Sequence, residues 1–158
     1  MPGKYLAVID TSILVSLFLN ETADDHANRA EQIVNENRET LVLPSLVVLE
    51  IIANSDLKLV QSLDAQARNK AVRETIRKLA KLKLRMVDLT PKVARLAARL
   101  IPECNIKAPD AVVVATAQAF GIPTVYTWDQ KLINATSKLG EITKVAEPPI
   151  IAQPTLGI

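Results

Sequence analysis

The sequence predicts a three-layer α/β/α fold with a central, mostly parallel five-stranded sheet. Short runs of β-branched and other apolar residues alternate with longer segments whose apolar residues recur at helical spacing, which is the pattern of parallel α/β proteins. The 158 residues are 49% hydrophobic, which is enough for one domain with a full core. No interdomain linker, internal repeat or low-complexity tract breaks this pattern.

Five short apolar runs are the predicted strands. They cover residues 5–9, 40–43, 84–87, 122–127 and 142–146. At least one helical segment separates each run from the next, and parallel strands require such a crossover connection. The order of the elements therefore favours a parallel sheet.

Seven segments between and beside these runs are the predicted helices. They cover residues 11–19, 24–37, 46–53, 62–82, 91–101, 109–120 and 130–137. Several ends carry the usual signals. Ser45 is an expected N-cap, Thr90-Pro91 is a cap followed by proline at the first helical position, Pro109 starts another helix, and Gly121 ends it.

The charge is unevenly distributed along the chain. The net charge is +2, but residues 58–99 contain 12 Lys and Arg against 3 acids, a segment charge of +9, which leaves −7 for the rest. In the helix over 62–82, the apolar residues Val72, Ile76 and Leu79 are expected to face inward. The opposite face is a basic stripe formed by Lys70, Arg73, Arg77 and Lys81. It suits contact with nucleic-acid phosphates, and a solvated helix face is the alternative.

Other features narrow the setting. The single cysteine, Cys104, excludes an intramolecular disulfide and is expected to be a buried thiol in a reducing compartment. No apolar run approaches the roughly 20 residues of a membrane span, so a cytoplasmic protein is expected. We expect residues 1–146 to form the domain and residues 147–158, rich in proline, to form an extended C-terminal tail.

Three acidic residues, Asp10, Glu50 and Asp110, lie in apolar runs, where carboxylates are rare without a partner. Asp10 and a fourth acid, Asp129, follow the carboxyl ends of predicted strands, while Glu50 lies inside an apolar helix and Asp110 in the first turn of a helix. In open parallel sheets, residues beyond the carboxyl ends of the strands meet in one crevice. Four ionised carboxylates share a crevice only with a positive charge among them, so the pattern predicts a bound cation.

Oxygen ligands without His or Cys favour Mg²⁺ or Mn²⁺ over zinc. One or two such ions can neutralise a phosphate and lower the pKa of water, which predicts phosphodiester hydrolysis. A His-based nuclease mechanism has little support, because His26 is the only histidine. Simpler roles remain open for three of the acids: an N-cap for Asp10, a helix-dipole contact for Asp110 and a turn for Asp129. Neither a cap nor a turn suits Glu50.

These motifs, in this order, resemble a PIN domain, particularly the VapC-like toxin ribonucleases of bacterial and archaeal toxin–antitoxin pairs. The matching pieces are Asp10-Thr11-Ser12 after the first strand, Glu50 in Leu-Glu-Ile, Asp110 opening Asp-Ala-Val-Val-Val-Ala-Thr-Ala, and Thr127-Trp128-Asp129 after Gly-Ile-Pro. The resemblance spans residues 5 to about 146, nearly the whole chain.

The resemblance implies a PIN-like nuclease domain over residues 1–146 and a metal-dependent endoribonuclease that cuts single-stranded or loop RNA. Its catalytic, metal-binding residues would be Asp10, Glu50, Asp110 and Asp129 with Mg²⁺ or Mn²⁺, supported by Thr11, Ser12 and Thr127. It also implies a homodimer and, for a toxin, a small antitoxin partner. Relatives often carry a further acid shortly after the last one, but Gln130-Lys131-Leu132 stands there, which weakens the case for a second metal site and not for the first.

Aromatic residues make up 3% of the chain, so base stacking is not expected to be the main mode of RNA binding. Trp128 is expected to be a packed aromatic, with a base or subunit contact as the alternative. Two other functions compete with the nuclease. The first is a non-catalytic PIN-fold binding or dimerisation module, which the presence of all four acids disfavours. The second is an aspartate-based phosphotransfer enzyme using Asp10, but Ser12 replaces the second acid of the Asp-x-Asp pattern of haloacid-dehalogenase-like phosphatases.

Overall fold

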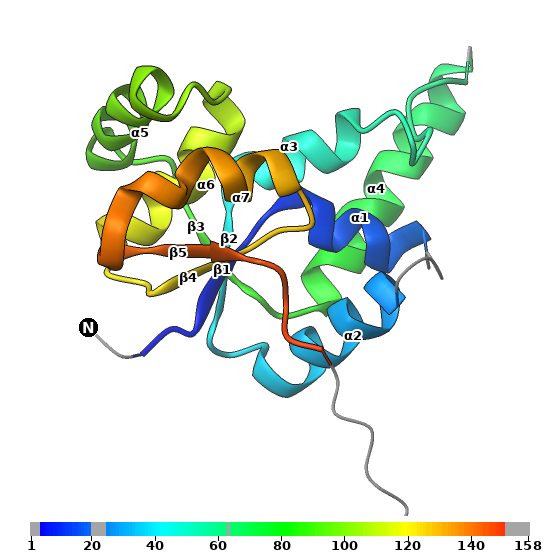
Figure 1. Cartoon of the computed structure of the whole chain (residues 1–158). Helices are drawn as coiled ribbons and strands as arrows, with labels where there is room; N and C mark the ends of the chain where they lie inside the picture. The colour runs from blue at the N-terminus through cyan, green and yellow to red at the C-terminus, as the bar shows by residue number, and fades with distance from the viewer. Residues whose placement is uncertain (1–3, 20–24, 63, 151–158) are drawn as a thin grey trace, which may run out of the picture.

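The computed structural model describes residues 4–19, 25–62 and 64–150 (Figure 1). Its five strands are β1 (Ala7–Ile9), β2 (Leu41–Pro44), β3 (Arg85–Val87), β4 (Thr124–Tyr126) and β5 (Lys144–Ala146). They form one sheet in the order β3-β2-β1-β4-β5, and every neighbouring pair is parallel. The predicted five-stranded sheet is therefore confirmed, and all of its pairs are parallel.

Seven α-helices surround this sheet within the described residues. They are α1 (Thr11–Leu19), α2 (His26–Asn37), α3 (Ser45–Ala53), α4 (Ala65–Lys81), α5 (Pro91–Cys104), α6 (Ala108–Phe120) and α7 (Gln130–Thr136), followed by the 3-10 helix η2 (Ser137–Ile142). Each predicted helix is present. Asp24, where the second was expected to begin, and residues 151–158 of the expected tail lie outside the described residues. None of the helices described is long and apolar enough to cross a membrane.

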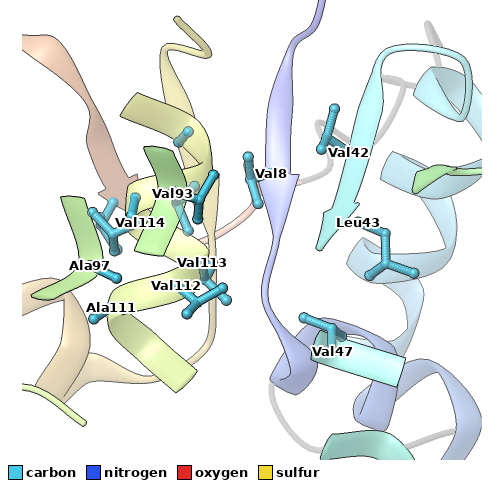
Figure 2. Close-up of a cluster of buried hydrophobic side chains, with 14 of the residues drawn as sticks. Val8, Val42, Leu43, Val47, Val93, Ala97, Ala111, Val112, Val113 and Val114 are labelled. Carbon is cyan, nitrogen blue, oxygen red and sulfur yellow. The ribbon is translucent and has the colours of Figure 1, made fainter. Parts of the chain in front are cut away.

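The two faces of the sheet carry different clusters of buried side chains, because successive side chains of a strand point to opposite faces. Val8 and Val42 belong to a cluster with side chains of α5 and α6, several of which are drawn in Figure 2. Ala7, Ile9 and Leu41 belong to a second cluster, which α1 and α2 complete. Helices thus cover both faces of the sheet, and the predicted three-layer fold is confirmed.

Several helix ends follow the predicted signals. The hydroxyl of Thr90 accepts a hydrogen bond from the backbone N–H of Val93, and Gly121 ends α6 in a left-handed conformation with φ of 64°. Helix α5 runs past the expected end to Cys104, whose burial confirms the predicted core thiol. Asn105 closes it in a left-handed conformation.

Two predictions, one about α3 and one about α4, are wrong. Ser45 is not the N-cap of α3: Pro44 holds that position with an extended backbone and no side-chain cap bond. The helix follows β2 directly, because Pro44 is still paired with β3. Ile76 does not face inward, since it is 48% exposed, whereas Thr75 is buried beside Leu79. The hydroxyl of Thr75 donates to the carbonyl of Ala71, which allows this polar side chain to be buried.

The basic stripe lies on the solvent side of α4. Lys70, Arg73, Arg77 and Lys81 are all exposed. Lys70 forms a loose ion pair with Glu74, at 3.9 Å between Nζ and Oε1, one turn along the helix. The stripe is therefore accessible to a large ligand.

Candidate active site

The strand order reverses between β1 and β4, at the carboxyl ends of the strands. From β1 the chain builds β2 and β3 on one side, and β4 and β5 on the other. Asp10 directly follows β1, and Thr127 directly follows β4. The backbone N–H of Asp10 donates to the carbonyl of Tyr126 over 3.0 Å, which holds the two strand ends together. Ligands of open parallel sheets bind at such a reversal.

An open pocket of about 390 Å³ lies at this point. We call it the acidic pocket. It is lined by Asp10, Thr11, Ser12, Val15, His26, Glu50, Asn54, Asp56, Asp110, Trp128 and Asp129. All four acids singled out in the sequence thus line one pocket, although they come from four separate parts of the chain.

Asp10 is the most deeply buried of these acids, at 6% exposure. Its Oδ2 atom accepts hydrogen bonds from the hydroxyls of Ser12, at 2.9 Å, and Thr127, at 2.7 Å. Among the described residues, the carboxylate of Asp10 accepts hydrogen bonds from these two hydroxyls and not from the backbone N–H groups that an N-cap would bind. The two hydroxyls fix the carboxylate and leave Oδ1 without a donor among the residues that the structure describes.

The same hydroxyls also organise the loop after β4. The backbone N–H of Trp128 donates to Ser12 Oγ over 3.0 Å, and that of Asp129 donates to Thr127 Oγ1 over 3.0 Å. Ser12 and Thr127 are themselves 3.2 Å apart at their oxygens. One network of short hydrogen bonds therefore sets the positions of Asp10 and of the segment that carries Asp129.

Glu50 reaches the acidic pocket from α3. Its Oε2 atom accepts a hydrogen bond from the hydroxyl of Thr11 at 2.6 Å. Burial raises the pKa of Glu50, the Thr11 hydrogen bond lowers it, and the negative charge of Asp10 raises it again, with a net rise. An acid in the middle of an apolar helix is thus held at the end of β1 by the first residue of α1.

Asp110 lies in the first turn of α6, and its pKa is clearly shifted from the ordinary value. Burial is the largest cause of a rise in its pKa to about 6. The negative charges of Asp10, Asp129 and Glu50, in that order, add to the rise, while Lys107 opposes it. The four acids therefore lie close enough to repel one another, a condition that favours a cation between them.

Asp129 has a local structural role as well. It is the N-cap of α7, and its Oδ1 atom accepts hydrogen bonds from the backbone N–H groups of Lys131, at 2.9 Å, and Leu132, at 3.3 Å. The sequence left an ordinary turn open as the simple role of Asp129, whereas the structure gives it the role of a helix N-cap. The cap fixes one oxygen and turns the carboxylate into the acidic pocket.

The four acids line the same pocket, but their side chains are not arranged as the ligands of one metal ion in the described residues. Within residues 4–19, 25–62 and 64–150, no three His, Cys, Asp or Glu side chains are arranged closely enough to hold one ion together. The donor chemistry nevertheless fits a hard divalent cation, because carboxylate oxygens with an elevated pKa lose that destabilisation when a cation joins them.

The sequence does not predict three polar residues of the acidic pocket: His26, Asn54 and Asp56. Asn54 and Asp56 follow α3 in an ordinary polar turn, where Asn54 Oδ1 accepts the backbone N–H of Asp56 at 2.9 Å. Neither has the apolar context that marks Asp10, Glu50 and Asp110. The only signal for His26 is that it is the chain's single histidine.

A sequence model of the PIN domain matches residues 7–138. The chain belongs to the PIN domain family. The match includes all four acids of the acidic pocket and every helix from α1 to α7. No curated protein sequence matches the chain significantly.

Solved structures share the PIN fold over most of the chain. A toxin–antitoxin complex from Klebsiella pneumoniae is 20% identical, with a TM-score of 0.62, covering 92% of this chain and 99% of that one. FitAcB from Neisseria gonorrhoeae is 20% identical, with a TM-score of 0.65 and coverage of 90% and 98%. VapC20 from Mycobacterium tuberculosis, a sarcin–ricin loop cleaving toxin, is 16% identical, with a TM-score of 0.60 and coverage of 82% and 94%. At these identities the similarity establishes the fold.

The pKa of Asp110 leads to a stability prediction. Its folded value of about 6 lies above the ordinary 3.8, so ionisation of Asp110 opposes folding, and the stability present below about pH 4 falls as the pH rises to about 6. Asp110→Asn removes this charge. We expect it to raise the melting temperature of metal-free protein at about pH 8 by roughly 2–4 °C, on the order of 1 kcal/mol after solvent screening.

Scanning calorimetry in EDTA at about pH 8 and pH 4 measures this effect. The gain should shrink at the lower pH, where the wild-type carboxyl is protonated. Added Mn²⁺ should then stabilise wild type more than Asp110→Asn. A variant that is less stable than wild type in EDTA at pH 8 would show that the four acids do not repel one another.

Proposed function

We propose that this PIN domain protein is a cytoplasmic, metal-dependent endoribonuclease and the toxin of a toxin–antitoxin pair. The convergence of four carboxylates in one pocket at the strand reversal, with the pKa of Asp110 raised by burial and by the charges of the other three, is the observation that carries the proposal. Residues with perturbed pKa values cluster at functional sites, so the raised pKa of Asp110 supports a functional role for this pocket. Membership of the PIN family gives the fold in which this pocket lies.

We assign Asp10, Glu50, Asp110 and Asp129 as the ligands, directly or through water, of Mg²⁺ or Mn²⁺. When bound, such an ion neutralises charge on the phosphate and lowers the pKa of an attacking water. Thr11, Ser12 and Thr127 orient the carboxylates. Thr11 holds Glu50, while Ser12 and Thr127 hold Asp10, so each of these ligands has one oxygen fixed by a hydroxyl.

The similar structures support the choice of activity and partner. One is a toxin–antitoxin complex, and VapC20 is a sarcin–ricin loop cleaving toxin. We propose a small antitoxin as the partner, and the resemblance to VapC-like toxin ribonucleases leads us to propose RNA as the substrate and a homodimer as the active form. The basic stripe of Lys70, Arg73, Arg77 and Lys81 is the proposed contact for RNA phosphates outside the acidic pocket.

A non-catalytic PIN-fold binding module is the alternative. The separation of the acids, which form no group of three around one point in the described residues, is the observation that favours it. Cleavage assays distinguish the two functions directly.

The first test is cleavage of a mixed RNA pool with Mn²⁺, with Mg²⁺ or with EDTA, after removal of any co-purifying partner. We expect cleavage only with metal, and at least a 100-fold loss of rate for Asp10→Asn, because this deeply buried carboxylate is central to the pocket. Glu39→Gln is the matched control: it removes an exposed carboxylate before β2, at the other end of the sheet, and should cleave normally. Cleavage that persists in EDTA or in Asp10→Asn would refute the metal site, and inactive wild type would favour the binding module.

The hydroxyl network gives a second prediction. Thr127→Val keeps the shape of the side chain but removes the hydroxyl that donates to Asp10 and accepts from Asp129. We expect Mn²⁺ affinity and cleavage to fall by roughly 10- to 100-fold, as for other residues that orient metal ligands.

Thr116→Val is the control for Thr127→Val. Its hydroxyl is equally buried but donates only to the carbonyl of Val112 inside α6. Calorimetric titration with Mn²⁺ should give wild-type affinity for Thr116→Val. Equal affinity for both variants would mean that the hydroxyl of Thr127 does not position the site.

The basic stripe gives a third prediction, tested by the salt dependence of RNA binding. Arg73→Gln with Arg77→Gln removes two charges from the stripe, and the slope of log affinity against log salt should become shallower by about 1.4 for single-stranded RNA. Arg95→Gln with Arg99→Gln removes an exposed pair with the same spacing from α5. If both double variants change the slope equally, the stripe is only a solvated face.

A further inference from the structure

The single tryptophan and the single histidine of the chain stack on each other beside the acidic pocket. The ring centroids of His26 and Trp128 are 4.0 Å apart, and the ring planes differ by 6°. His26 is the first residue of α2, and Trp128 lies in the loop between β4 and α7. Both residues are partly exposed and line the same pocket as the four acids.

Directional contacts hold the Trp128 ring in place. Its Nε1 donates to Ser16 Oγ at 2.9 Å, and Ser16 is fully buried and donates in turn to the carbonyl of Ile13. Its backbone N–H donates to Ser12 Oγ. The guanidinium of Arg29 lies 4.8 Å from the ring centroid. A ring that is ordered before binding loses little entropy when a planar ligand stacks on it.

Arg29 extends this support to the far end of the chain. Besides contacting Trp128, it forms an ion pair with Glu147 at 3.3 Å and donates to the carbonyls of Pro148 and Pro149. The segment after β5 thus helps to hold the arginine against the tryptophan. Contacts from α1, α2 and residues 147–149 therefore hold the stacked pair in place.

The position of the pair relative to the carboxylates indicates its ligand. Trp128 directly precedes Asp129, and both line the acidic pocket. A phosphate held at the carboxylates by the proposed cation would therefore have the ring pair within reach of its adjoining nucleotide. Flat nucleobases stack on such rings with little preference for the base. Bases are free to do so only in single strands, loops or bulges, because duplex bases are already stacked.

We propose that His26 and Trp128 form a stacking platform for the nucleobase next to the phosphate that is cut. This inference rests on the proposed nuclease function and names the part of the substrate that the edge of the site recognises. The platform selects unpaired RNA without selecting a sequence. It adds one base contact to binding that otherwise depends on phosphates.

The intrinsic fluorescence of the protein reports this one ring, because Trp128 is the only tryptophan. Wild-type protein is titrated, with Ca²⁺ in place of Mg²⁺ and with the RNA checked for intactness, against a single-stranded oligoribonucleotide of roughly ten nucleotides. A matched strand has an abasic ribose at every position, so that no binding register places a base on the rings. We expect the intact strand to quench Trp128, and the abasic strand to bind about tenfold more weakly without quenching it. Identical quenching and affinity for the two strands would overturn the proposal.

Cleavage kinetics test the same contact in the active enzyme. His26→Ala should raise KM for single-stranded RNA about tenfold, and His26→Phe should restore it because phenylalanine keeps a stacking ring. Phe120→Ala is the control, since it removes an exposed aromatic ring from the far end of α6. If His26→Ala and Phe120→Ala both match wild type, the ring pair is only packing.

The two experiments separate this inference from the proposed function. RNA cleavage with no difference in quenching or affinity between the intact and the abasic strand refutes the platform and leaves the nuclease intact. A clear abasic effect in a protein that never cuts RNA supports the platform and refutes the nuclease, which identifies an RNA-binding module.

Discussion

Mutual repulsion between carboxylates is the constraint on which the rest of this structure depends. Four acids line one pocket, and burial, together with the negative charges of the other three, raises the pKa of Asp110 to about 6. Folding must supply the free energy to hold them together, and it does so with the most regular part of the molecule. The parallel pairing of β1 with β4 brings Asp10 and Asp129 to one edge, and the apolar helices α3 and α6, packed against each other and the sheet, deliver Glu50 and Asp110. Each acid is thus attached to an element that cannot move away without opening the core.

Hydroxyl groups do the finer positioning. Thr11, Ser12 and Thr127 each donate to a carboxylate, and the latter two also accept backbone N–H groups of the β4–α7 loop. A hydroxyl can donate and accept at once, so a small number of short side chains connects two loops that are more than 100 residues apart in the sequence. Lysine or arginine at these positions would neutralise the acids permanently and remove the reason to bind a cation. Neutral donors orient the carboxylates and leave their charge available.

The sequence predicts the sheet, the seven helices and the four acids, because all of these depend on apolar context that a single chain displays. Asp10, Glu50 and Asp110 stand out since their neighbours are buried. The errors occur where context is ambiguous: Ser45 follows a strand too closely to act as a cap, and helical spacing alone does not choose between Thr75 and Ile76 for the inner face. His26 reaches the pocket only through packing of α2, which no local pattern specifies, and Asn54 and Asp56 lie in an unremarkable turn. An acid in an apolar run can be recognised from the sequence, whereas a contact between segments distant in the chain cannot.

The overall amino-acid composition does not show where the few aromatic residues lie in the fold. Aromatic residues are 3% of the chain, and on average such a chain has little means of stacking on bases. Yet the one tryptophan and the one histidine are brought together at the acidic pocket. Phosphate contacts along a basic helix would hold any RNA, and carboxylates with a cation would act on any phosphodiester. The proposed platform would require an unstacked base, so it would be able to distinguish a loop from a duplex, and two rings would discriminate by RNA shape without any reading of sequence.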